Sequence, residues 1–350
     1  MRSAKVMATL YGACFVLYAD ASWGQRYNCG DGTRRAGGCD CSRVPHTHAA
    51  TVGGQYICAP DAPSPRPAPL PVAPPTPRPR RPEPPRPQEE PTNCPEGMVL
   101  IPAGTFTMGD ESVGATPLHT VTLRAFCIDR TEVTVAQYRQ CPSGRCSAPN
   151  AYVNTRGNSN FFCNWGRPGA DEHPVNCVDW NQARAWCQWR GGDLPTEDQW
   201  EYAARGTAAR PYPWGPEAPS GERTNLCGSE CVAYASANGF SGWGQVANWT
   251  DRWGATAPVG ELPAAGNTPD TGLVGMAGNV WEWTRTPLGG YTSSSGAATR
   301  YVNVDRTLRV LRGGCWYNYD PSWARAGLRL GSAMTDRSLS VGFRCVREGR

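Results

Sequence analysis

Cysteine is the residue that most constrains how this chain can fold. The chain has 16 cysteines in 350 residues, and all but Cys14 lie beyond residue 21. Residues 1–21 have the pattern of a secretory signal, with a basic start at Arg2 and Lys5, a short apolar stretch and a small-residue cleavage site. Cysteines that follow an export signal form disulfides by default, because the compartment is oxidising. Cleavage would leave an odd number of cysteines, so at least one thiol is left over or pairs between chains.

The same N-terminus allows two other interpretations. An uncleaved anchor is one, although the apolar stretch 6–18 is short for a membrane span. Lipidation at Cys14 is the other, but the preceding residues 11–13 suit such a site poorly. We therefore expect an exported protein that is periplasmic, cell-surface or secreted, with no transmembrane helix after signal removal.

Residues 22–58 form a small polar segment with its own cysteines. Four cysteines in so short a stretch predict two local disulfides among Cys29, Cys39, Cys41 and Cys58. A metal site is the alternative, and His46 and His48 add a mild hint of one. The spacing of Cys39 and Cys41 is unusual for zinc.

Residues 59–93 are dominated by proline, with arginine and glutamate interspersed. Such a stretch cannot bury a core, favours extended polyproline II and acts as a semi-rigid spacer. A ligand for a proline-recognition module is the alternative. Outside this stretch the arginines are dispersed and the net charge is only +4, which argues against a nucleic-acid partner.

Residues 94–350 form the main domain, and their local signals are sparse. Three capping boxes predict short helices that begin at Thr134, Asp179 and Thr196. Apolar runs at 98–102 and 121–126 are typical of strands. Beyond the third helix, glycine, asparagine, proline and tryptophan predict long irregular loops. We therefore expect a loop-rich α+β domain that needs disulfides to hold it.

Eight sequence blocks occur in one order along this domain. They cover residues 97–109, 129–134, 173–180, 194–197, 200–206, 278–283, 312–314 and 342–345. The ordered set resembles the formylglycine-generating (sulfatase-modifying factor) family over roughly residues 94–347. The resemblance implies an irregular, disulfide-stapled α+β fold related to C-type lectins.

The family's oxidase holds copper with two cysteine thiolates that follow a late Gly-Gly. In this chain Asn318 stands at the first thiolate position, and no cysteine stands at the second. Cys315 follows Gly313-Gly314, where the family usually has serine. A single thiolate does not make a two-thiolate copper site, although soft thiolates suit Cu(I). The sequence therefore provides no confident catalytic residue, and Cys315 would act only if the protein is an enzyme.

No other catalyst is evident. His119 and His173 each lack a second ligand at metal spacing, and the chain contains neither H-E-x-x-H nor G-x-S-x-G.

Calcium is the cofactor that the resemblance implies, because exported loop-rich domains often hold it with oxygen ligands. The first site would use Asn225, the Leu226 carbonyl, Asp251 and the Trp253 carbonyl. The second would use Glu282 with the carbonyls of Gly275, Gly278 and Val280. The alternative is that Asp251 caps a turn and Glu282 pairs with an arginine.

By the same resemblance, Cys187 pairs with Cys345. The remaining cysteines suggest local closures at Cys141–Cys146, Cys163–Cys177 and Cys227–Cys231, with Cys94–Cys127 as a further pair. This scheme leaves Cys315 over, either as a buried inert thiol or as a reactive one.

Two functions follow from these observations. The first is a non-oxidase binding or structural module whose ligand is a protein, a peptide or a glycan. The alternative is a copper-dependent oxidase that converts a substrate cysteine to formylglycine.

Overall fold

The computed structural model describes residues 93–296, 299 and 301–348, together with the backbone of four strands nearer the N-terminus. Those strands are β1 (Arg26–Asn28), β2 (Arg34–Ala36), β3 (Thr47–Val52) and β4 (Gln55–Pro60), paired as two antiparallel hairpins. The chain divides into two compact units, of which one holds these hairpins (Leu17–Arg86) and the other holds Pro87–Arg350. The predicted signal, the side chains of 22–58 and the spacer up to residue 92 lie outside the described residues.

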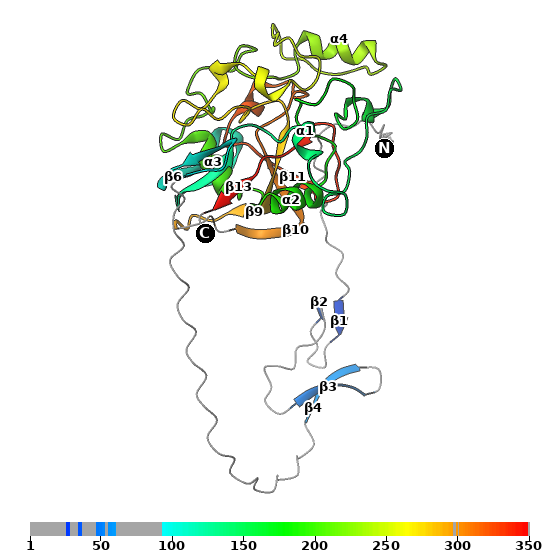
Figure 1. Ribbon diagram of the computed structural model, residues 1–350. Helices are drawn as coiled ribbons and strands as arrows, with labels where there is room; N and C mark the ends of the chain where they lie inside the picture. Colours follow the sequence, from blue (N-terminus) through cyan, green and yellow to red (C-terminus); the bar gives the residue numbers. More distant parts are fainter. Residues whose placement is uncertain are drawn as a thin grey trace, which may run out of the picture. The chain divides into compact units, whose positions relative to one another are not determined.

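Three short helices begin where the capping boxes predicted them. In each, the side chain before the helix accepts a hydrogen bond from the third helical amide, and a glutamine there binds back to the cap. They are α1 (Val135–Tyr138), α2 (Trp180–Trp189) and α3 (Glu197–Arg205). Figure 1 shows them in green shades within the larger unit, and α2 and α3 both contact the long strand β9.

Three sheets complete the larger unit. Strands β11, β10, β9 and β12 form one sheet in that order, β13, β8 and β5 form a second, and β6 pairs with β7. Their bounds are β5 Met98–Ile101, β6 Gly104–Asp110, β7 Ala115–Leu123, β8 Phe126–Asp129, β9 Trp281–Tyr291, β10 Tyr301–Arg312, β11 Arg329–Ala333, β12 Val341–Gly342 and β13 Val346–Glu348. Single turns of 3-10 helix lie at Glu111–Val113, Ser159–Phe162, Val259–Glu261, Ala264–Gly266 and Pro321–Ala324.

The structure departs from the sequence-based expectation in three places. The strand expected at 121–126 is the end of β7 and the start of β8, because the chain leaves the ladder at residues 124–125. A fourth helix, α4 (Ser229–Ala237), was not predicted, since its first turn has no side-chain cap. The strands β9 and β10, of 11 and 12 residues, replace part of the expected loops.

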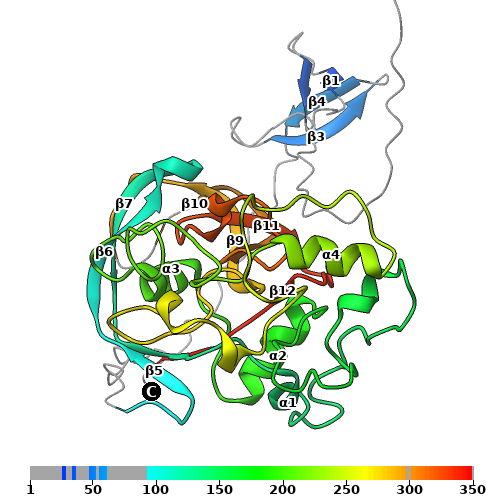
Figure 2. The same cartoon turned by 90° about the horizontal axis from the view of Figure 1, so that it is seen from above.

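Tryptophan dominates the core, which explains how a domain with short elements buries enough apolar surface. Trp186, Trp281 and Trp283 pack with Phe343 in one cluster, and Trp200 belongs to a second with Phe106 and Met108. Each large ring buries an area that several small side chains would otherwise have to supply. Seen from above, α2, α3 and α4 lie around the central strand β9 (Figure 2).

Five disulfides hold the loops of this domain together. They join Cys94 to Cys127, Cys141 to Cys146, Cys163 to Cys177, Cys187 to Cys345 and Cys227 to Cys231. These are the pairs predicted above. Four of them close loops of 33 residues or fewer, whereas Cys187–Cys345 joins α2 to the segment before β13 across 158 residues.

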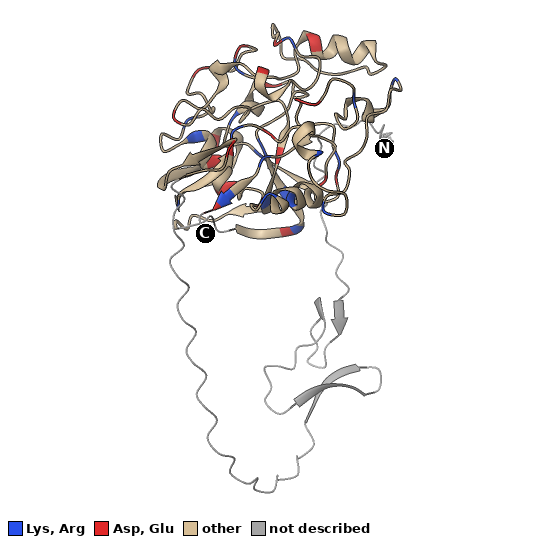
Figure 3. Cartoon of the chain, viewed as in Figure 1, with Lys and Arg blue, Asp and Glu red and all other residues tan. Residues whose placement is uncertain are grey.

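Positive and negative residues are interspersed along the ribbon of the larger unit (Figure 3). Two of the arginines, Arg312 and Arg344, are fully buried and paired with glutamates. Within the described part of the chain, no helix is long and apolar enough to cross a membrane.

Candidate functional site

Two glycines that follow β10 shape the segment in which the resemblance implies the oxidase thiolates. Gly313 and Gly314 have φ values of 100° and 77°, which favour glycine. A Cβ at Gly314 would lie 2.5 Å from the Trp323 carbonyl oxygen, so the chain passes too closely there for any side chain. The turn directs the following residue, Cys315, into the core, where its side chain is fully buried.

Asn318 closes this turn. Its Oδ1 accepts a hydrogen bond from the Cys315 amide at 2.8 Å, and its own amide donates to the Cys315 carbonyl at 3.0 Å. Its carbonyl accepts from the Cys227 amide at 2.9 Å, which ties the turn to the Cys227–Cys231 loop. The Asn318 side chain therefore contributes one hydrogen bond to the turn, and its backbone contributes two.

No second free thiol lies among the described residues 93–348. It belongs to none of the five disulfides, and the other ten cysteines between residues 93 and 348 are all disulfide-bonded. The described residues therefore do not form a two-thiolate copper site.

Aromatic rings cover the same segment. Trp243, from the loop after α4, lies edge-on to Tyr317 with ring centres 4.4 Å apart and contacts Trp316 at 5.6 Å. Phe162 contacts Trp316 from another side at 5.1 Å. Tyr319, two residues after Tyr317, is 57% exposed. The segment thus presents a partly exposed aromatic surface.

The first predicted calcium site is assembled around Asp251. One carboxylate oxygen accepts the Trp253 amide at 3.0 Å, and the other accepts the Leu226 amide at 2.9 Å and the Trp249 indole at 3.1 Å. Asp251 therefore caps a turn, as the alternative foresaw. All these partners are neutral, and burial raises the pKa of Asp251 to about 6.

The neighbouring Asn225 supports a cation at this first site. Its Nδ2 donates to the Ala255 carbonyl at 2.9 Å, whereas its Oδ1 is buried and has no hydrogen-bond partner within the described chain. A buried amide oxygen without a hydrogen-bond partner suits a hard cation such as Ca²⁺. The Asn225 side chain therefore fits calcium, whereas both Asp251 oxygens already accept N–H groups.

The second predicted site is arranged differently. Glu282 is fully buried, pairs with Arg344 at 2.7 Å and accepts the Trp200 indole at 2.7 Å. Its carboxylate is thus already neutralised by an arginine, which is the alternative that the sequence left open.

Three residues that the site predictions did not include complete this region. Asn279 donates to Glu132 at 2.9 Å and accepts from Asn225 at 3.3 Å, so it links the two predicted sites. Glu132 is fully buried, and burial raises its pKa to about 7. With Arg344, these residues lie inside the sequence blocks quoted above. The sequence could have pointed to them, because each is a polar or charged residue in a block whose other residues are mostly buried.

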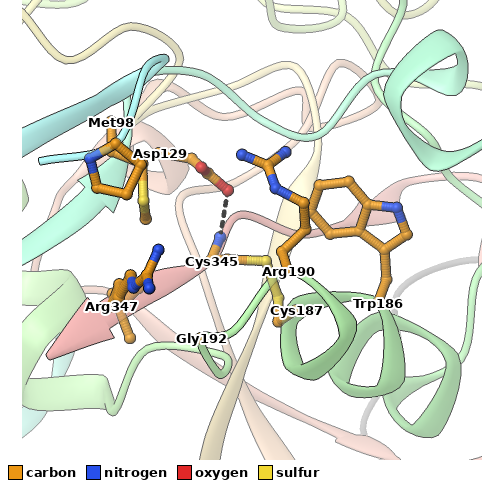
Figure 4. A pocket seen from close by; sticks show the side chains of 10 residues that line it. Met98, Asp129, Trp186, Cys187, Arg190, Gly192, Cys345 and Arg347 are labelled. Atoms are coloured by element: carbon orange, nitrogen blue, oxygen red, sulfur yellow. Dashed lines mark hydrogen bonds between the residues drawn. A yellow bond between two sulfur atoms is a disulfide. The ribbon is translucent and has the colours of Figure 1, made fainter. Parts of the chain in front are cut away.

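A small cavity opens beside the Cys187–Cys345 disulfide (Figure 4). Its volume is about 70 Å³, which suits one or two water molecules. Asp129 and Arg190 line it, and the Asp129 carboxylate accepts the Cys345 amide at 2.9 Å. No predicted metal or catalytic residue lines this cavity.

Comparison with known proteins identifies the family to which this chain is related. The family model for the sulfatase-modifying factor enzyme 1-like domain matches residues 83–349. The formylglycine-generating enzyme of Streptomyces coelicolor is 33% identical over 301 residues, which span 72% of this chain and 89% of that protein. The inactive C-alpha-formylglycine-generating enzyme 2 of Bos taurus is 31% identical over 292 residues, or 71% and 87% of the two chains.

A solved structure agrees with the sequence comparisons. PvdO from Pseudomonas aeruginosa superimposes with a TM-score of 0.51 at 25% identity, over 72% of this chain and 94% of that one. The predicted irregular α+β fold is confirmed by this similarity and by the short, disulfide-linked elements. The chain belongs to the sulfatase-modifying factor (formylglycine-generating enzyme) family.

Proposed function

We propose that this protein is an exported member of the family that does not oxidise cysteine and acts as a binding or structural module. The observation that supports this proposal concerns Asn318, which occupies the position where the resemblance implies a thiolate. Its side-chain oxygen accepts a hydrogen bond from the Cys315 amide. One of the relatives of similar identity is itself named as inactive, which agrees with a non-oxidase role.

Export is supported by the signal-like residues 1–21 and by the disulfides of the larger unit, which are typical of oxidising compartments. The partner would be a protein, a peptide or a glycan. The aromatic surface formed by Trp243, Tyr317 and Tyr319 supports this choice, because such rings bind apolar and sugar faces well. Calcium would hold the loops at the first site, with Asn225 and Asp251 as side-chain ligands and the Leu226 and Trp253 carbonyls beside them.

An oxidase assay tests the proposal. The purified full chain, loaded with copper, is incubated with a cysteine peptide of the sulfatase type, and the peptide mass is followed with time. We expect no formylglycine, while the Streptomyces coelicolor enzyme run in parallel converts the peptide. Copper-dependent conversion by this chain that disappears in Cys315→Ser would establish the oxidase alternative.

A further inference from the structure

One tryptophan ring holds two arginine side chains. Trp180 is the first residue of α2, is 6% exposed, and donates its indole N–H to the Thr284 carbonyl of β9 at 2.8 Å. The guanidinium carbons of Arg184 and Arg309 lie 5.2 Å and 4.6 Å from the centre of its ring. Because an indole ring attracts cations to its face, this contact holds both guanidinium groups in place.

Arg184 is neutralised by an ion pair. Its Nε and Nη2 donate to the two carboxylate oxygens of Asp193 at 2.9 Å and 3.0 Å. Arg325 presents the same two nitrogens to the carboxylate of Asp110. Two parallel hydrogen bonds of this kind form one of the strongest ion pairs in proteins, and they leave little net charge behind.

Arg309, which lies on β10, has no such partner. Its Nη1 donates to the carbonyls of Arg306 and Leu308 at 2.8 Å and 3.0 Å, and these acceptors carry no net charge. Its Nε is buried and has no hydrogen-bond partner within the described chain. Because a guanidinium stays protonated in proteins, Arg309 keeps a fixed positive charge that no described carboxylate contacts.

The nearest charges add to that of Arg309 instead of offsetting it. Burial and the positive charges of Arg184 and Arg306 lower the pKa of the Arg309 side chain. Arg306 is exposed, and Arg309 is half-buried, so both side chains are in contact with solvent. An anion that arrives from solvent would therefore gain from at least two positive charges.

The acidic residues of the same strands are already engaged. Asp193 pairs with Arg184 and also lies 3.9 Å from the Nη1 of Arg285. Asp305 is exposed, and one of its oxygens accepts hydrogen bonds from the amide and the hydroxyl of Thr307. These carboxylates reduce the positive charge of the region but do not bind Arg309.

We propose that Arg309, assisted by Arg306, forms a binding subsite for an oxyanion, such as a sulfate, phosphate or carboxylate group. A guanidinium carries several N–H donors in one plane, which match the oxygen atoms of such groups. Stacking on Trp180 and the two carbonyl contacts hold the Arg309 head in position before the anion binds. The inference goes beyond the proposed function and uses none of its residues.

Calorimetric titration of the full disulfide-bonded chain with sodium sulfate, at low ionic strength, tests the subsite. We expect saturable binding of one sulfate ion, with competition from phosphate and acetate. Arg309→Gln should bind sulfate about tenfold more weakly, as the loss of a charge-assisted hydrogen bond implies. Arg306→Gln should have a smaller effect. Arg145→Gln is the matched control, because Arg145 is an exposed arginine elsewhere in the domain, and its affinity should not change.

A polymer that carries the same group distinguishes the two sources of the anion. Dextran sulfate is titrated in the same way, with neutral dextran as its control. Tighter binding per sulfate group than for the free ion, lost in Arg309→Gln, would support the subsite and assign it to a sulfated polymer. Equal affinity per sulfate group, also lost in Arg309→Gln, would support a subsite for the free ion.

Melting temperatures show whether the variants are folded. If Arg309→Gln is unstable, Arg309→Lys keeps the charge but not the planar set of donors, and it should still bind sulfate more weakly than the unchanged protein. Unaltered sulfate affinity in both variants would overturn the inference and leave Arg309 a packing role only. Unsaturable binding that is the same in all variants would mean an adventitious ion only, which overturns it too.

Discussion

Asn318 contributes to the turn after Gly314 through a side chain that is almost fully buried. Its side-chain oxygen accepts a hydrogen bond from the buried Cys315 amide, and only 5% of its surface is exposed. The neighbouring Cys315 keeps a sulfur in the same turn, but at a fully buried position. At the scale of single residues, the identity of residue 318 matters because its side chain supplies a hydrogen-bond acceptor to a buried backbone amide.

Asn318→Ala tests this role. The change leaves the Cys315 amide buried without its acceptor, so we expect the free energy of unfolding to fall by about 1–3 kcal/mol. Denaturant titration measures the loss. Asn154→Ala is the matched control, because Asn154 is exposed and such surface changes stay within about 0.5 kcal/mol. A loss in Asn318→Ala no larger than that of the control would show that the turn does not depend on this side chain.

At the scale of elements, the short helices depend on disulfides and tertiary packing for their stability, because they are too short to be stable alone. The helix α2 has 10 residues and α4 has 9, which is below the length at which isolated helices are stable in water. The disulfide Cys187–Cys345 ties α2 to the segment before β13, and Cys227–Cys231 staples the start of α4. The two crosslinks differ mainly in the length of chain they close.

The two disulfides should therefore differ in their contribution to stability. The chain-entropy relation gives roughly 5 kcal/mol for the 158-residue loop and roughly 2 kcal/mol for the 4-residue loop. All four cysteines are buried, so the double alanine variants Cys187→Ala/Cys345→Ala and Cys227→Ala/Cys231→Ala are comparable. Unfolding in denaturant under non-reducing conditions ranks them. Equal losses would mean that local packing outweighs loop closure.

At the scale of the whole molecule, the core of the larger unit contains several buried ion pairs between glutamate and arginine. Glu197 and Glu201 pair with Arg312, and Glu282 pairs with Arg344, all at fully buried positions. Glu132 shares Arg344 with Glu282, whereas the hydrogen-bond partners of Asp251 are all neutral. Asp251 is therefore the place where a divalent cation would offset negative charge and connect distant loops.

Calcium should stabilise the whole domain for this reason. Binding only to the folded state adds about 2.7 kcal/mol at a free concentration of 100 Kd, or roughly 5–10 °C in Tm for a domain of this size. Melting in chelator and then in Ca²⁺ measures the gain. Asp251→Asn should remove the part due to the first site. An unchanged Tm, with elemental analysis showing no retained metal, would rule out calcium.

Local signals in the sequence were sufficient to predict three helix starts and, together with the family resemblance, the five disulfides of the larger unit. Thr134, Asp179 and Thr196 marked the starts of three helices, because a capping box depends only on residues within one turn. The paired cysteines followed from short spacings and from the family resemblance. The position of Asn318 where the resemblance implies a thiolate stays a prediction from the sequence.

Tertiary structure decided what depends on contacts between distant segments. The helix α4 has Gly228 at its start and no capping side chain, so no local signal marks it. The partners of β9 lie up to 60 residues away along the chain, at β12. Likewise, the family resemblance implied Glu282 as a metal ligand, but only the folded chain places Arg344 against both Glu282 and Glu132. Caps and spacings are short-range, whereas charge compensation in a core depends on which side chains the fold brings together.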